Sequence, residues 1–221
     1  DSNLSIGAMA TTASLETLEA QTQCEPVLAA VASKVGSPHV RNFGTVVGNV
    51  CHADPGGDLI PALLCLEGSV CLRSPRGERV VKVDEFVVGP FTTTISDDEI
   101  ALTIEVPDPG EGWSYGCRKV VRRSGDLAMA TCVVMLRTDG RRLEDIRISV
   151  GGAVTRASRL GVVERALCGS LIDELPETLL SSDLWNLEPL ILPSSAGEEG
   201  YLTDMFPRVV AATLDDALGG G

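Results

Sequence analysis

The residues best suited to chemistry lie between positions 40 and 58. This segment combines two glycines, a hydroxyl and an amide, Gly44, Gly48, Thr45 and Asn49, with a Gly-rich turn that ends at Asp58. Glycine lets the backbone approach a ligand closely because it has no Cβ, and successive N–H groups in such a loop form a concave anion site. The Asp58 carboxylate can accept hydrogen bonds from ribose or ribityl hydroxyls. The pattern predicts a loop over residues 44–49 that binds a phosphate-bearing cofactor.

The composition is that of an ordinary globular protein. The chain has 221 residues, 44% hydrophobic and 22% charged, which suffices for one large or two small cores. Its net charge of −13 argues against nucleic acid, because binding a phosphate backbone needs clustered Lys and Arg. The sequence contains no apolar run of about 18 residues, so we expect no transmembrane helix. The first residues lack the basic and apolar regions of a signal peptide. We therefore expect a cytoplasmic protein without a membrane span or nucleic-acid partner.

Cysteine and histidine spacing predicts no metal site in this chain. The seven cysteines are scattered, and no two are separated by two residues as in zinc or iron–sulfur motifs. Scattered thiols in apolar surroundings fit a reducing compartment. His39 and His52 are the only histidines, and they lie too far apart for a convincing metal site.

Hydrophobic periodicity and turn residues predict mixed elements in the first half of the chain. We expect a strand over residues 4–8, a short helix carrying Leu15 and Leu18, helices over residues 24–35 and 58–66, a hairpin from residues 70–73 and 79–83, and a strand over residues 100–106.

Residues 107–112 combine two prolines with two glycines and are the best candidate for a domain boundary. The division expected is 1–108 and 109–221. After the boundary we expect strands over residues 113–121, 127–136 and 146–150. From Leu160 onward we expect acidic helical structure with an apolar stripe of Val162, Val163, Ala166 and Leu167. Antiparallel strands and helices in two unequal lobes predict an α+β protein.

Residues 40–58 closely resemble the flavin-binding medium subunits of molybdenum hydroxylases. That family includes aerobic carbon monoxide dehydrogenase and the flavin domain of xanthine dehydrogenase. The resemblance covers essentially the whole chain in order. The further motifs that carry it are Val88-Gly89-Pro90-Phe91-Thr92-Thr93-Thr94, Asp98-Glu99-Ile100, Glu105-Val106-Pro107, Lys119, Arg122-Arg123-Ser124-Gly125-Asp126 and Gly151-Gly152-Ala153.

The resemblance implies the second lobe of a two-lobe FAD-binding domain, an antiparallel sheet with helices. A smaller C-terminal domain of three antiparallel strands plus helices follows it. Carried over to this sequence, Thr45, Val46, Val47, Gly48 and Asn49 line the FAD pyrophosphate, Asp58 lies near the hydroxyl-bearing chain, Ile100, Ala101 and Leu102 lie beside the isoalloxazine ring, and Lys119, with Arg118 as a neighbouring candidate, lies near the flavin.

Some of these assignments have structural alternatives. Asp58 also fits a plain helix N-cap, and Lys119 also fits a solvated strand lysine. The Arg122-Arg123 pair is more often a surface or subunit contact than a catalytic one.

The chain departs from the family pattern in two ways. Relatives usually carry two adjacent glycines where this chain has Val47-Gly48, and a positive φ at Val47 would strain the site. The chain also starts at a point that corresponds to the middle of the family's flavin domain. We therefore expect a fragment, a disordered first lobe, or a first lobe supplied by another polypeptide.

By resemblance the chain is an electron-transfer subunit of an oxidoreductase complex. Its FAD accepts electrons from 2Fe-2S clusters of an iron-sulfur small subunit, which receives them from the molybdenum cofactor of a large subunit. The final acceptor is NAD, a quinone or oxygen. This implies a hetero-oligomer with no catalytic acid–base pair in this chain.

Three other interpretations can be compared with this one. The first is a non-catalytic scaffold subunit that has lost FAD. The second is a self-contained flavin oxidase of the vanillyl-alcohol type, with Cys51 or His52 near the loop. The third, a nicotinamide-binding Rossmann domain, is disfavoured because no G-x-G-x-x-G follows a strand.

Overall fold

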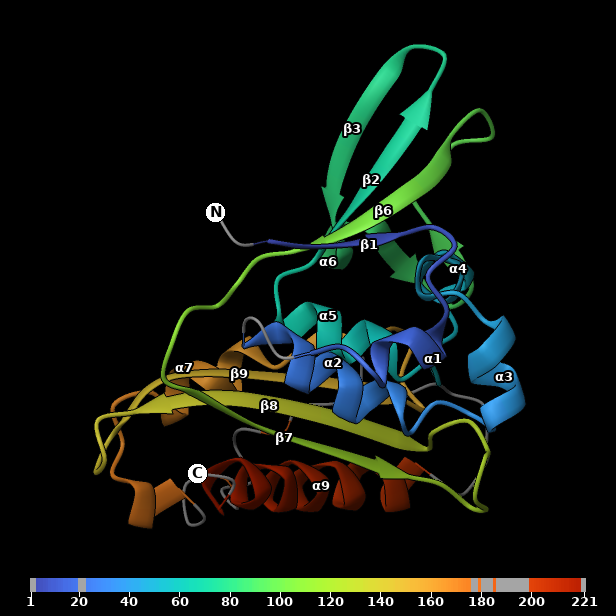
Figure 1. Cartoon of the computed structure of the whole chain (residues 1–221). Helices are drawn as coiled ribbons and strands as arrows, with labels where there is room; N and C mark the ends of the chain where they lie inside the picture. The colour runs from blue at the N-terminus through green and yellow to red at the C-terminus, as the bar shows by residue number, and fades with distance from the viewer. Residues whose placement is uncertain (1–2, 20–22, 176–178, 180–184, 186–198, 220–221) are drawn as a thin grey trace.

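The computed structural model describes residues 3–19, 23–175, 179, 185 and 199–219. A central antiparallel sheet carries helices on both faces, and a second antiparallel sheet is raised above one of these helical layers (Figure 1). No helix in the described ranges is long and apolar enough to cross a membrane.

The raised sheet consists of four antiparallel strands from the first half of the chain. In spatial order these are β1 (Leu4–Gly7), β6 (Ile100–Val106), β2 (Ser69–Ser74) and β3 (Gly77–Lys82). The expected strands and hairpin are confirmed, and the β2–β3 hairpin projects from the body (Figure 1). Two short strands, β4 (Val87–Gly89) and β5 (Thr92–Thr93), form a separate ribbon.

The described residues of the first half of the chain form six helices. They are α1 (Thr12–Leu15), α2 (Cys24–Ala32), α3 (Pro38–Phe43), α4 (Val46–His52), α5 (Leu59–Cys65) and α6 (Val83–Phe86). The sequence predicted α1, α2 and α5 but not α3. That helix begins because the Ser37 hydroxyl accepts the N–H of Val40 and Pro38 suits a first turn.

The central sheet is formed by the second half of the chain. Its spatial order is β10 (Ser158–Arg159), β9 (Leu143–Gly152), β8 (Ala130–Thr138) and β7 (Trp113–Val120). The three expected antiparallel strands are present, and the two-residue β10 adds a fourth at the edge.

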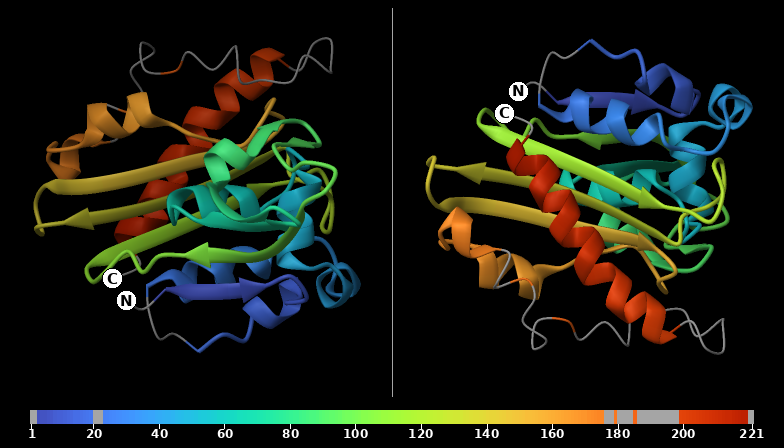
Figure 2. Two further views of the ribbon diagram at one scale, coloured as in Figure 1. Left: turned by 90° about the horizontal axis from the view of Figure 1, so that it is seen from above. Right: turned by 90° about the horizontal axis from the view of Figure 1, so that it is seen from below.

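The central sheet is covered on both faces. Alternate residues of β8 enter different cores: Val133 and Met135 pack with α2 and α5, whereas Cys132 and Val134 face α9 (Glu199–Gly219) and α7 (Gly161–Leu167). Figure 2 shows α9 crossing the lower face obliquely. The first core therefore includes residues on both sides of the expected boundary, and the division at 108 stays a prediction.

The expected helical structure after Leu160 is present in α7 and α9. The stripe predicted for α7 was half wrong: Val163 and Leu167 are buried, but Val162 and Ala166 are exposed. The helix turns fewer than two times against β9, so only the residues four apart reach the core. Residues 176–178, 180–184 and 186–198 of this expectation lie outside the described part.

Gly116 of β7 lets α9 approach the sheet closely. A Cβ at this position would lie 2.2 Å from Thr213 O and 3.0 Å from Ala217 N. We expect Gly116→Ala to lower the free energy of unfolding by roughly 1–3 kcal/mol or more, because the helix backbone must move. Equilibrium urea unfolding measures this. In the matched variant Gly200→Ala the new methyl meets nothing within 4 Å, so its stability should not fall; equal losses in both variants would contradict the packing argument.

Candidate functional site

Thr45 caps the N-terminus of α4. Its backbone is extended, and its Oγ1 accepts the N–H of Gly48 at 3.1 Å. The expected loop over residues 44–49 was therefore wrong, because Val46 to Asn49 form the first turn of α4. The glycines in this segment suggested a loop, but the Thr45 hydroxyl satisfies one of the free N–H groups that otherwise make a helix start costly.

Val47 is not strained. The non-glycine residues with positive φ in the described chain are Ala53, Glu67 and Phe91. The Val47 side chain is 3% exposed and belongs to the first hydrophobic core, while Gly48 beside it is exposed. A Cβ on Gly48 would lie 2.6 Å from Thr45 Oγ1. A side chain at position 48 would therefore displace the Thr45 hydroxyl that caps α4, whereas valine is accommodated at position 47.

The start of α4 is fixed against the segment that follows β1. Thr12 N donates to Gly44 O at 2.8 Å, and Val46 N donates to Ala10 O at 3.0 Å. Thr11 and Thr45 also form an isolated antiparallel bridge. The sequence predicted only a short helix in this segment, so it did not reveal the role of Thr11 and Thr12 in holding α4.

The predicted residues of β6 lie close to this turn. Leu102 O accepts the N–H of Ala8 at 2.7 Å, two residues before Ala10 binds Val46. Ile100 is 61% exposed, Ala101 and Leu102 are half-buried, and α4 packs against β6. The structure therefore brings the group from Thr45 to Asn49 together with Ile100, Ala101 and Leu102.

Asp58 and Lys119 form a second group, a buried ion pair. Lys119 Nζ donates to Asp58 Oδ2 at 2.6 Å and to Lys34 O at 3.0 Å, and Thr131 Oγ1 donates to Asp58 Oδ1 at 2.7 Å. The side chains of Asp58 and Lys119 are 4% and 9% exposed. Both structural alternatives were wrong, since the Asp58 side chain does not cap α5 and Lys119 is not solvated.

Burial raises the pKa of the Asp58 carboxyl, and the hydrogen bonds from Lys119 and Thr131 oppose this shift. A carboxylate has about four lone-pair sites, so Asp58 retains acceptor capacity beside its two partners. Its predicted contact with the hydroxyl-bearing chain of a cofactor stays a prediction.

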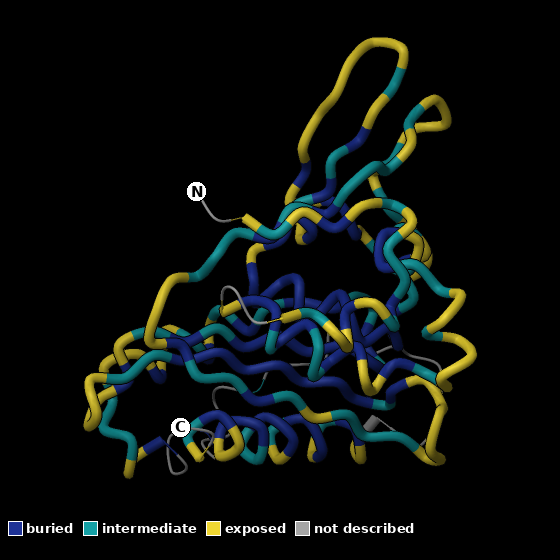
Figure 3. The backbone as a smooth tube through the Cα atoms, in the orientation of Figure 1, coloured by how far each residue is buried: buried dark blue, intermediate teal, exposed yellow. Residues whose placement is uncertain are grey.

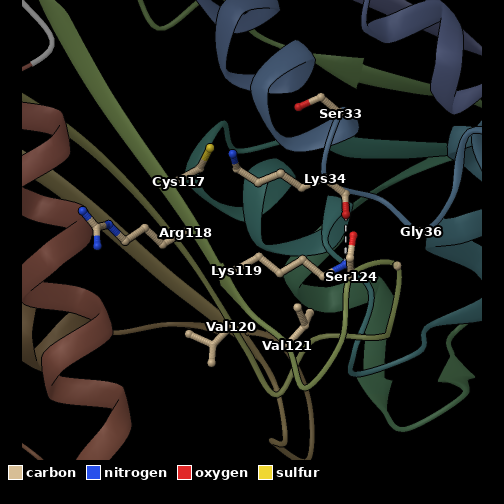
Figure 4. A pocket seen from close by; sticks show the side chains of 10 residues that line it. Ser33, Lys34, Gly36, Cys117, Arg118, Lys119, Val120, Val121 and Ser124 are labelled. Carbon is tan, nitrogen blue, oxygen red and sulfur yellow. Dashed lines mark hydrogen bonds between the residues drawn. The ribbon is translucent and has the colours of Figure 1, made fainter.

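An open cleft of about 560 Å³ lies beside the ion pair (Figure 4). Its lining residues are Ser33, Lys34, Gly36, Cys117, Arg118, Lys119, Val120, Val121, Ser124 and Gly125. The ends of the Lys34 and Cys117 side chains point toward each other in this cleft (Figure 4). Arg118, the neighbouring candidate, is bound to Asp216 of α9 at 2.6 Å. None of residues 45–49 lines this cleft.

The two groups are linked through the turn between α4 and α5. A Cβ on Gly57 would lie 3.5 Å from Asn49 Oδ1, so the Asn49 side chain lies against the backbone that leads directly into Asp58. Gly57 N also donates to Asp54 O at 2.9 Å, which closes the turn. The position of α4 is thereby coupled to the Asp58–Lys119 pair.

Cys51 and His52, which were considered for a covalent flavin link, lie in the last turn of α4. His52 packs against Phe91 with ring centroids 5.1 Å apart. Burial raises the pKa of the half-buried Cys51 thiol, which disfavours its nucleophilic thiolate.

Two family descriptions match the chain in succession. Residues 1–109 match the FAD binding domain in molybdopterin dehydrogenase, and residues 116–181 match the CO dehydrogenase flavoprotein C-terminal domain. These matches define a flavin-type domain followed by the C-terminal domain of the same class of subunit.

Individual proteins agree with these matches. The nicotine 6-hydroxylase medium subunit of Paenarthrobacter nicotinovorans is 38% identical over 74% of this chain and 57% of its own length. The 6-hydroxypseudooxynicotine dehydrogenase complex subunit alpha of the same organism is 30% identical over 99% of this chain and 74% of its own length. A solved structure of carbon monoxide dehydrogenase from Hydrogenophaga pseudoflava superposes with a TM-score of 0.89 at 29% identity, covering 99% of this chain and 76% of that chain.

The chain therefore belongs to the family of FAD-binding medium subunits of molybdenum hydroxylases. It spans about 57% of the length of the nicotine 6-hydroxylase medium subunit.

The residues around the start of α4 fit the cofactor that the family implies. The N–H of Val46 binds Ala10 O and that of Gly48 binds Thr45 Oγ1, which leaves the N–H of Val47 without an acceptor among the described residues. A helix N-terminus carries a partial positive charge that favours phosphate. Asn49 Oδ1 is buried and has no hydrogen-bond donor in the described part of the chain. A free N–H, an exposed glycine and an orphaned acceptor together suit a diphosphate with adjoining hydroxyls.

The buried ion pair generates a stability prediction. Asp58→Ala leaves the Lys119 ammonium buried without its partner, which should cost roughly 3–5 kcal/mol. In the background of Lys119→Met, which removes the charge but keeps an apolar stem, the same substitution should cost less by at least about 1 kcal/mol. A double-mutant cycle in urea measures both losses. Equal costs in the two backgrounds would show that the pair does not couple.

Proposed function

We propose that this chain holds FAD as the electron-transfer part of a medium subunit in a molybdenum hydroxylase complex. The observation that carries the proposal is the capped start of α4, where an acceptor-free N–H, the exposed Gly48 and the orphaned Asn49 oxygen meet beside β6. Family membership supports the same cofactor.

Each group of residues has a defined part in this proposal. Thr45, Val46, Val47, Gly48 and Asn49 line the diphosphate, to which the N–H of Val47 donates, and Ile100, Ala101 and Leu102 lie along the isoalloxazine ring. Asp58 accepts a hydroxyl of the sugar-like chain while Lys119 keeps its carboxylate charged. Bound FAD supplies a ring that accepts electrons and passes them on, and the protein positions it and sets its potential.

The proposal includes partners that supply and remove electrons. We infer an iron-sulfur small subunit with 2Fe-2S clusters and a large subunit with the molybdenum cofactor, assembled with this chain in the cytoplasm. A relative whose name describes a dehydrogenase complex subunit supports such an assembly. Arg122 and Arg123 are exposed on the β7–β8 connection, as a subunit contact requires.

The alternative, a scaffold subunit that has lost FAD, rested in part on the expectation that a positive φ at Val47 would strain the site. Val47 is instead part of the first hydrophobic core and has no positive φ. This argument for the scaffold therefore falls, and the flavin content decides between the two proposals.

Flavin quantitation by acid extraction tests the proposal on the complex purified with its partner subunits. We expect about one flavin per chain in the wild type and at least about tenfold weaker flavin retention in Gly48→Val, because the new side chain covers the helix start. Gly200→Ala, on α9 and with open space around its new methyl, is the matched control. Urea unfolding of each variant excludes loss of flavin through unfolding. A flavin-free wild-type complex would favour the scaffold, and full flavin in folded Gly48→Val would refute the placement of the site.

A further inference from the structure

Strand β3 is an exposed edge of the raised sheet. It pairs with β2 on one side, and no strand in the described part of the chain pairs with its outer side. The hairpin stands clear of the body and its outer strand is exposed along most of its length (Figure 3). Val80 in its middle is 64% exposed. Natural proteins usually cover, shorten or charge such an edge, because its free backbone groups can bind another strand.

The hairpin turn determines which backbone groups point outward. Ser74 and Gly77 close a two-residue turn and form the first pair of the ladder. Antiparallel ladders alternate between pairs that exchange hydrogen bonds and pairs whose N–H and C=O groups point away. The outward groups of β3 therefore belong to Glu78, Val80 and Lys82, whose side chains also share one face of the sheet.

Ion pairs within the single chain fix the conformation of the β2–β3 hairpin. Arg73 Nε donates across the hairpin to Glu78 Oε1 at 2.8 Å. Arg79 donates to both carboxylate oxygens of Glu99 at 2.6 and 2.7 Å, and this contact lowers the pKa of Glu99 to about 2. The hairpin is thereby tied to the segment that enters β6, which reduces the ordering cost of binding.

We propose that β3 pairs with β3 of a second copy of this chain, antiparallel and centred on Val80. In this register Glu78 of each copy lies opposite Lys82 of the other, and the two Val80 side chains meet on the two-fold axis. Opposite charges and apolar side chains facing each other across a strand pair are favourable.

Neighbouring registers that use the same outward groups are less favourable. Centring on Arg79 would set the two Arg79 side chains against each other, and centring on Val81 would place Lys82 opposite Val80. The sequence of this edge is thus complementary to itself in one register, as a two-fold interface requires. The contact consists of about six backbone hydrogen bonds and a small side-chain area, so the association is weak and falls at high salt.

Sedimentation equilibrium of the 221-residue chain, from about 10 µM to 1 mM, tests the proposal in a range suited to weak complexes. We expect reversible dimerisation in the wild type. Lys82→Glu places the new carboxylate opposite Glu78 of the other copy, and this repulsive pair occurs twice in the dimer. The substitution should weaken association at least about tenfold. Arg208→Glu, an equal charge reversal at an exposed position of α9, should leave the association unchanged.

Amide hydrogen exchange gives an independent readout that does not need a variant. The N–H groups of Glu78, Val80 and Lys82 should become protected as the concentration rises, while those of Arg79 and Val81 are protected at every concentration. A wild-type chain that stays monomeric throughout, or a dimer that Lys82→Glu does not weaken, would overturn the proposal. So would dimerisation without concentration-dependent protection at these three amides.

Discussion

The buried contact between the Asp58 carboxylate and the Lys119 ammonium joins the two halves of the chain. Asp58 precedes α5 of the first half, and Lys119 lies on β7 of the second. Thr131 of β8 and the Lys34 carbonyl complete the hydrogen bonds of the pair. A buried charge without its partner is strongly destabilising. Other placements of the α2 and α5 layer on the central sheet would separate the two charges and are therefore disfavoured.

That constraint reaches the proposed cofactor site through the turn before α5. Pro55 O accepts the N–H of Gly152 at 2.7 Å, so the turn is also bonded to β9. On its other side α4 is held by Ala10 and Thr12 of the segment after β1. Because both ends of α4 are fixed by the fold, its first turn is positioned before a ligand binds, which lowers the ordering cost of binding there. The Thr45 cap and the exposed Gly48 leave the start of α4 accessible to a ligand.

Much of the fold followed from local patterns in the sequence. The strand expected over residues 100–106 matches β6 to the residue, and the helix expected over residues 24–35 begins with α2 but extends beyond its end at Ala32. The helix α4 was missed because Gly44 and Gly48 suggested a loop, whereas the Thr45 hydroxyl at the N-cap outweighs one glycine within a helix.

The candidate site was less visible than the fold. The resemblance to a known family named its residues, but the partners of those residues depend on tertiary packing. Asp58 and Lys119 are 61 positions apart, and no periodicity links them. The bonds from Ala10 and Thr12 to the start of α4 arise from two backbone segments whose side chains carry no signal of the contact. Likewise, no local pattern around Gly116 predicts that α9 packs against it.

The most direct test of the central claim is a density map of this chain within its assembled complex. We expect the flavin diphosphate against the N–H of Val47 beside the exposed Gly48, with the ring running toward Ile100. A diphosphate bound elsewhere on the chain, or a helix start covered by protein side chains, would contradict it.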